Sequence, residues 1–270
     1  ISLMKTTKKT PADKQGEQIT APEDMKVEYT NAFVLKGNSL QPFSTDQETA
    51  AKISAEKQSL EKKFKSESEL SEVILNNGKI LFGEKTLLIV TKKQSIIDFG
   101  GAFMPDGILI DFTNPERRRI YLINVILSNE NFAELFLEMT SLFSFFKKKE
   151  NILLFREMLV KIISQNIGLR NSFKKLTGKG AIPEFFESSI NCIPHVLLVM
   201  DTLRPELNGF METYTETWGR YIKPMVIRKF TVNGNAIITT VPIFSELEKK
   251  LNGKRNGSAD KVIKATEEDH

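Results

Sequence analysis

The chain has 270 residues, of which 40% are hydrophobic and 27% are charged, with a formal net charge of +4. This composition is that of an ordinary soluble protein, and the mild positive charge permits nucleic-acid binding without requiring it. Cys192 is the only cysteine, which excludes an internal disulfide and, with only two histidines, an ordinary four-ligand zinc site. We expect a cytoplasmic protein without a membrane span, since a lone cysteine fits a reducing compartment and no apolar run could cross a bilayer.

The N-terminal part of the chain is expected to lie outside the main domain. Residues 1–25 are rich in Lys, Thr, Gln and Pro and offer almost nothing to bury, so we expect a disordered tail. Residues 26–63 are expected to form an extension made of a strand and the first part of a helix. The strand, which could also be one arm of a hairpin, is predicted over 27–37.

A long helix is predicted over residues 47–77, which contain neither proline nor glycine and are dominated by Ala, Glu, Lys and Leu. Thr45 and Glu48 have the spacing of a capping box at its start, and Asn77 before a glycine supplies a stop. Only the second half is amphipathic, so we expect a break near Ser66. The fold is therefore predicted to begin with a long N-terminal helix.

Strands and helices alternate over residues 64–244, which predicts one α/β domain with a mixed central sheet flanked by helices. A polar tail is expected over 245–270. Asn233-Gly234 favours a type I′ turn and therefore a hairpin. Segment 168–182, which contains KKLTGKG, is expected to be a basic loop. The other predicted elements are strands at 86–91 and 194–201 and helices at 129–146, 150–166 and 204–221.

The central feature is a predicted hairpin between Gly100 and Leu127, in which the apolar runs GILIDF and IYLINVIL are joined by a polar turn. The second run is apolar at nearly every position, so both of its faces are expected to be covered. Asp106 stands at the mouth of the first run, and Asn124 is the polar residue inside the second. On its own, Asp106 reads as a turn-favouring residue after proline. Opposite a polar residue in a buried hairpin, it also suits a site built on rigid strands.

A Pro-Asp pair that opens one strand of such a hairpin resembles the PD-(D/E)xK nucleases, which share the fold of restriction endonucleases. The likeness extends over residues 64–242. Within it, FKSESELSEVILNNGKILFGE resembles the first helix of that fold, and HVLLVMD and the last hairpin resemble later strands of uncharacterised bacterial members. The resemblance implies a restriction endonuclease-like core, which runs helix, three strands, helix, strand, as the predicted elements do.

In an active member of that family, Asp106 would hold Mg²⁺, which takes hard oxygen ligands and activates a water molecule. Glu67 aligns with the helix acid that often completes the site, and Glu69 is an alternative for that role. The family's next strand carries Glu-x-Lys or Glu-x-Glu, but those positions are Asn124 and Ile126 here. The resemblance therefore implies an ancestral site of Asp106, Glu67 and Asn124 that has lost its activity and needs no cofactor, or Mg²⁺ if activity remains.

Two further departures affect the same pocket. Ser71 stands where the family commonly has a glutamine, and Met139 stands where the helix after the hairpin often has one. Several losses in one pocket favour decay of the site over one tolerated exchange. The alternative is that the acids have moved, since Glu130, Glu134 or Glu138 on the following helix could reach the pocket.

Basic residues gather at the predicted hairpin turn, at 147–149 after a helix, and in the KKLTGKG segment. If they contact phosphates, binding would be salt-dependent and largely independent of base sequence. If they do not, they are a solvated surface. The residues expected to bind nucleic acid are Arg117, Arg118, Arg119, Lys174, Lys175 and Lys179.

Three functions compete. The first is a nuclease-fold protein with a degenerate site that works as a nucleic-acid-binding or assembly component. The second is an active Mg²⁺-dependent DNA endonuclease with relocated acids, and the third is a protein-interaction module that binds no nucleic acid. The expected partner is therefore DNA or another protein. The missing acid at Asn124 separates the first from the second, and basic groups clustered on one face would separate the first from the third.

Overall fold

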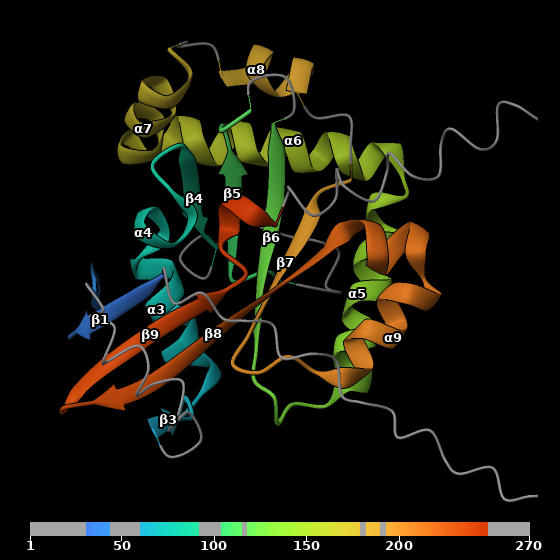
Figure 1. The fold of residues 1–270 in the computed structure, drawn as a ribbon. Coiled ribbons are helices and arrows are strands. Elements are labelled where there is room, and N and C mark those ends of the chain that lie inside the picture. The colour runs from blue at the N-terminus through green and yellow to red at the C-terminus, as the bar shows by residue number, and fades with distance from the viewer. Residues whose placement is uncertain are drawn as a thin grey trace, which may run out of the picture.

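The structure is a computed structural model, and it describes residues 31–43, 60–91, 104–114, 118–178, 182–189 and 193–247. Within these residues a mixed β-sheet forms the centre and helices cover both of its faces (Figure 1). The expected α/β class with a mixed sheet between helices is therefore confirmed. The strands are β1 (Ala32–Lys36), β2 (Ser39–Pro42), β3 (Glu61–Lys62), β4 (Thr86–Val90), β5 (Gly107–Asp111), β6 (Arg119–Ile126), β7 (His195–Met200), β8 (Ile222–Val232) and β9 (Asn235–Val241).

The sheet is antiparallel at its two ends and parallel in its middle. Its order is β2-β1-β9-β8-β7-β6-β5-β4, and β3 pairs with β8. Strands β4, β5 and β6 form an antiparallel meander, whereas β7 is parallel to β6 and β8 is parallel to β7. Parallel neighbours need a long crossover connection, and the helices after β6 and after β7 supply one each.

Helices pack on the two faces of the sheet in unequal numbers. Because side chains alternate along a strand, β6 sends Leu122 and Ile126 to one face and Tyr121 and Val125 to the other. The first face is covered by α5 to α9, and the second by α3, α4 and a short turn at Phe244–Glu246. The helices are α3 (Glu67–Asn76), α4 (Gly78–Phe82), α5 (Phe132–Phe146), α6 (Lys149–Gln165), α7 (Ile167–Thr177), α8 (Ile182–Ser189) and α9 (Pro205–Thr213).

Several sequence predictions are confirmed. The central hairpin is β5 and β6, and the strand predicted at 86–91 is β4. Asn233 and Gly234 have φ values of 50° and 78°, the left-handed backbone that a type I′ turn requires. The predicted break at Ser66 is the N-cap of α3, where the Ser66 hydroxyl accepts a hydrogen bond from the Glu69 N–H.

Three predictions are wrong. The helix expected through residues 60–65 is interrupted by β3, where pairing with β8 overrides the helix propensity of Glu and Lys. The basic loop expected at 168–182 is mostly α7, whose Phe173 is fully buried and whose end is set by Gly178 in a left-handed conformation, φ 66°. The polar tail expected over 245–270 is wrong at its first residues, because Leu247 follows the Phe244–Glu246 turn and is buried.

Other predictions fall outside the described residues. They include the tail at 1–25, the predicted helix over 47–59 and most of the expected C-terminal tail. In the part of the chain that the structure describes, the helices are too short or too polar to cross a bilayer.

Candidate functional site

The structure brings Asp106 and Asn124 together across the β5–β6 hairpin. Gly107 pairs with Ile123, so the register continued by one residue sets Asp106 opposite Asn124. The Asp106 N–H donates to the Ile123 carbonyl over 2.8 Å, which holds the acid at the mouth of β5. Two apolar runs joined by a short turn thus position both residues on rigid strands.

The Asp106 carboxylate is buried, with 4% of the residue exposed, and it joins α3 to the hairpin. Its Oδ1 accepts a hydrogen bond from the Ser71 hydroxyl over 3.2 Å, and its Oδ2 accepts one from the Val125 N–H over 3.0 Å. Gly107 permits this close packing, since a Cβ there would lie 3.0 Å from Leu75 Cδ2 and 3.2 Å from the Ile89 carbonyl oxygen. Neutral donors therefore already occupy both oxygens of this acid.

Asn124 and Ile126 point to the face of the sheet that α5 covers. Asn124 is 7% exposed, and its Nδ2 is buried without a hydrogen-bond partner among the described residues. Ile126 lies in the hydrophobic core with Leu135 and Met139 of α5, so it offers neither charge nor a proton. A buried amide donor without an acceptor at hydrogen-bond distance is costly, and the nearby Glu138 carboxylate is the group placed to accept from it.

Acidic side chains gather beside Asn124, and they come mainly from α5. The pKa of Glu138 is raised by partial burial and then by the charge of Glu130, while the nearby Asn124 amide acts to lower it. Glu67 and Glu134 are also close enough to raise this pKa. Glu138 and Glu134 are exposed, so these carboxylates form a rim around the buried amide.

Glu67 begins α3, and its charge is close enough to Glu138 to raise the pKa of that residue. Glu69, the alternative for the same role, does something else. It pairs with Lys229 of β8 over 2.6 Å and accepts a hydrogen bond from the Lys65 N–H over 2.7 Å. Burial acts to raise the pKa of Glu69, but these two partners lower it overall. Glu69 therefore ties α3 to β8.

The residues at the family's metal positions do not fit Mg²⁺ well. Asp106 is engaged by neutral donors, Asn124 brings an uncharged amide, and Ile126 brings no ligand atom. Within the described part of the chain, no three His, Cys, Asp or Glu side chains are grouped so that they could hold a metal ion. We therefore derive no metal-dependent step at Asp106.

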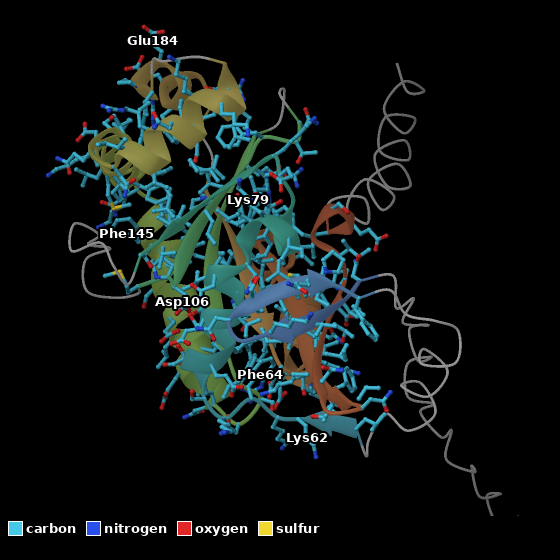
Figure 2. All side chains as sticks on the ribbon, turned by 90° about the vertical axis from the view of Figure 1, so that its left-hand side faces the viewer. Lys62, Phe64, Lys79, Asp106, Phe145 and Glu184 are labelled. Carbon is cyan, nitrogen blue, oxygen red and sulfur yellow. The ribbon has the colours of Figure 1, made fainter. Side chains whose placement is uncertain are left out.

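The arginines predicted to bind nucleic acid lie away from Asp106 and Asn124. Arg119 begins β6 opposite Asp111, about 16 Å along the strand from Asn124 at ~3.3 Å per residue. The guanidinium of Arg118 lies 4.4 Å from the centre of the Phe185 ring of α8. Figure 1 shows α6, α7 and α8 together at the end of the sheet where β6 begins, and in Figure 2 Glu184 of α8 lies far from Asp106.

Lys174 and Lys175 are exposed in the last turn of α7, at this same end of the molecule. Arg117 and Lys179 lie outside the described residues. Of the residues predicted to bind nucleic acid, those that the structure describes thus lie near α7 and α8 instead of near Asp106. The hairpin register could have revealed the separation, because residues 119 and 124 stand near opposite ends of one strand.

Comparison with protein-family models, with curated proteins and with solved structures gives no match for this chain. The likeness to PD-(D/E)xK nucleases therefore remains an interpretation of motif order.

Proposed function

We propose that this chain is a nuclease-fold protein with a degenerate site, which binds nucleic acid or assembles with a partner without hydrolysing phosphodiester bonds. The succession α3, β4-β5-β6 meander, α5 and parallel β7 supports a restriction endonuclease-like core, because that core runs helix, three strands, helix, strand. A cytoplasmic location, suggested by the single cysteine, belongs to the same proposal.

The observation that carries this proposal is the pair formed by Asp106 and Asn124. In the nuclease pattern a second acid and a lysine would face the pocket from β6. Here an amide stands opposite Asp106 and an isoleucine is packed into the core. Asn124 and Ile126 can supply neither a general base nor a charged metal ligand. The buried hydrogen bonds of Asp106 join the hairpin to α3.

The charge distribution supports binding at another surface. Helices α3 and α5, which lie beside Asp106 and Asn124, carry acids and no Lys or Arg, so their exposed faces repel phosphates. Helix α7 carries Arg170, Lys174 and Lys175 and no acid. We therefore propose that nucleic acid contacts the end of the molecule built by α6, α7 and α8.

A titration of labelled duplex and single-stranded DNA at low and moderate salt tests this proposal. We expect changing Lys174 and Lys175 to Ala to weaken binding and to reduce the salt slope by nearly one unit per lost phosphate contact. Lys62 and Lys63 are adjacent, exposed lysines elsewhere, so their double Ala variant is a matched control that should bind as the unmodified chain does. Equal binding by all three proteins would show that Lys174 and Lys175 do not contact DNA. Absence of binding even at low salt would favour a protein-interaction module.

A second candidate is a Mg²⁺-dependent endonuclease with relocated acids, favoured by the position of Glu138 beside Asn124. Its pKa is raised first by partial burial and then by the charges of neighbouring carboxylates, and a bound cation would offset those charges. This candidate predicts saturable thermal stabilisation by Mn²⁺ that is lost in Glu138→Gln and kept in Glu150→Gln, which changes an exposed acid of α6. The degenerate-site proposal predicts no saturable effect of Mn²⁺ in any of these proteins.

A further inference from the structure

Several nitrogen-bearing side chains converge where the parallel strands begin, on the face of the sheet opposite to Asn124. Tyr121 of β6 pairs with His195 of β7, and Leu197, two residues further on, pairs with Lys223 of β8. Alternation along each strand therefore directs Arg119, Tyr121, His195 and Lys223 to one face. The distance between the Tyr121 and His195 ring centres is 5.6 Å, which confirms that the two side chains are neighbours.

Lys223 is the least ordinary member of this group, because only 4% of it is exposed. Its Nζ donates a hydrogen bond to the Arg220 carbonyl over 2.7 Å, and no carboxylate among the described residues pairs with it. An ammonium has three donors, so further acceptors are needed. A buried cation without a counter-charge is strongly unfavourable unless something anionic completes its surroundings.

Further positive charge surrounds Lys223. Burial and then the charge of Arg119 lower the pKa of Lys223 to about 8. Burial, followed by the charges of Lys223, Arg119 and Arg220, lowers the pKa of His195 to about 3. His195 is therefore neutral at physiological pH and keeps one N–H donor, while the other three side chains crowd positive charge around it.

Acids lie at the edge of this group. Asp111 lies opposite Arg119, and its Oδ1 accepts a hydrogen bond from the Thr113 N–H over 2.8 Å. Glu216 pairs with Arg220 over 3.7 Å, with side chains that are 87% and 52% exposed respectively. Such an exposed pair is weak and easily rearranged. The half-exposed Arg220 guanidinium is therefore the member of this group that an anion from solvent can contact first.

We propose that Lys223, Arg119, Arg220 and His195 form a binding site for a phosphate group. A phosphate dianion carries enough charge to balance several cations and has acceptor oxygens for the ammonium, the guanidiniums and the imidazole N–H. The site lies on the sheet face opposite to the Asn124 pocket. It does not depend on the nuclease-fold proposal, because it rests on the register of β6, β7 and β8 and on the burial and contacts of Lys223 and Arg220.

The phosphate could belong to a small molecule or to the end of a nucleic acid, and the experiment separates the two. Binding is measured on the full chain by calorimetry, with inorganic phosphate, adenosine monophosphate, and one short oligonucleotide carrying either a 5′-phosphate or a 5′-hydroxyl. Inorganic phosphate is expected to bind saturably. Preference for the phosphorylated oligonucleotide over its hydroxyl form would identify a nucleic-acid end, and preference for the mononucleotide would identify a small molecule.

Variants decide whether binding occurs at this site. Lys223→Met is expected to weaken phosphate binding at least tenfold, and its folding is not at risk because it removes a buried charge. Arg220→Met, at a half-exposed position, should weaken binding severalfold, whereas Lys62→Met at an exposed position should leave it unchanged. Absence of saturable binding to inorganic phosphate, or equal affinity in Lys223→Met and the unmodified chain, overturns the proposal.

Discussion

Two groups of like-charged side chains lie on opposite faces of the same sheet, and they differ in how much water reaches them. Beside Asn124, the carboxylates of Glu134 and Glu138 stand on the exposed surface of α5. In the other group, Lys223 is buried on its face of the sheet. Water screens the first group, so crowding there costs little, whereas desolvation amplifies the cost in the second. A bound counter-ion is therefore expected to stabilise the protein more at Lys223 than beside Asn124.

Asp106 differs from both groups, because it is a buried acid whose oxygens accept hydrogen bonds from Ser71 and Val125. Charge alone does not make a buried group unfavourable when donors surround it. Substitutions of Asp106, Lys223, His195 and Glu138 should therefore have effects that follow burial and partners.

Asp106→Ala should lower the free energy of unfolding by about 3 kcal/mol, because it leaves the buried Val125 N–H without an acceptor and separates α3 from the hairpin. Chemical denaturation measures the change. Glu72→Ala, at an exposed position of the same helix, should alter stability by less than about 0.5 kcal/mol. A loss below about 1 kcal/mol in Asp106→Ala would mean that these hydrogen bonds do not join α3 to the sheet.

Lys223→Met should raise the free energy of unfolding at pH 7 by about 2 kcal/mol, in a buffer without phosphate or sulfate. The folded-state pKa of about 8 lies below the ordinary value of 10.5, so stability is lost as pH falls from 10.5 through 8. The unmodified chain should therefore become more stable between pH 7.5 and 9.5. Denaturation curves across this range should show no such rise in Lys223→Met, and a rise of equal size in both proteins would contradict the assignment.

Acid should destabilise the chain through His195. The folded-state pKa of His195, about 3, lies below the ordinary value of 6.5. Below pH 6.5 the unfolded chain therefore binds a proton at His195 that the folded chain does not bind, which favours unfolding. We expect this group to lose about 1.5 kcal/mol of stability between pH 6.5 and 5. The slope of stability against pH should be shallower in His195→Gln, and identical slopes would show that His195 is not held neutral.

Glu138→Gln should have the smallest effect, a gain of about 0.5 kcal/mol or less, since exposed like charges interact weakly. The raised pKa of Glu138 means that stability is highest below its folded-state value and declines as pH rises through it. The gain should therefore be seen at pH 7 and vanish near pH 4. It should also shrink in high salt, and a salt-independent gain would point to packing instead of charge.

The strands were predictable because their signals are local. Strands β5 and β7 contain the unbroken apolar runs ILI and VLLVM, and the run of β6 is interrupted only by Asn124. Asn233-Gly234 favours a type I′ turn. The sequence does not predict helix α7, because the glycines of KKLTGKG favour a loop. In the structure, Gly178 ends the helix. Strand β3 was missed because pairing with β8, far along the chain, decides its conformation.

The candidate site was predictable to the same extent. The hairpin pattern alone sets Asp106 opposite Asn124, because register follows from the two runs. The group around Lys223 was not predictable, since residues 119, 195 and 223 meet only once the order β6-β7-β8 is known. Nor could the sequence reveal that Ser71 and the Val125 N–H occupy the oxygens of Asp106, which depends on where α3 lies against the sheet.

Incubation of purified protein with supercoiled plasmid and linear DNA in Mg²⁺ and in Mn²⁺ tests the proposed function most directly. The unmodified chain should leave both substrates intact, as should Asp106→Ala and Glu138→Gln, because an amide and an isoleucine stand where β6 would carry the catalytic pair. Cleavage by the unmodified chain that disappears in Asp106→Ala or Glu138→Gln would contradict the degenerate-site proposal and establish an active endonuclease with relocated acids.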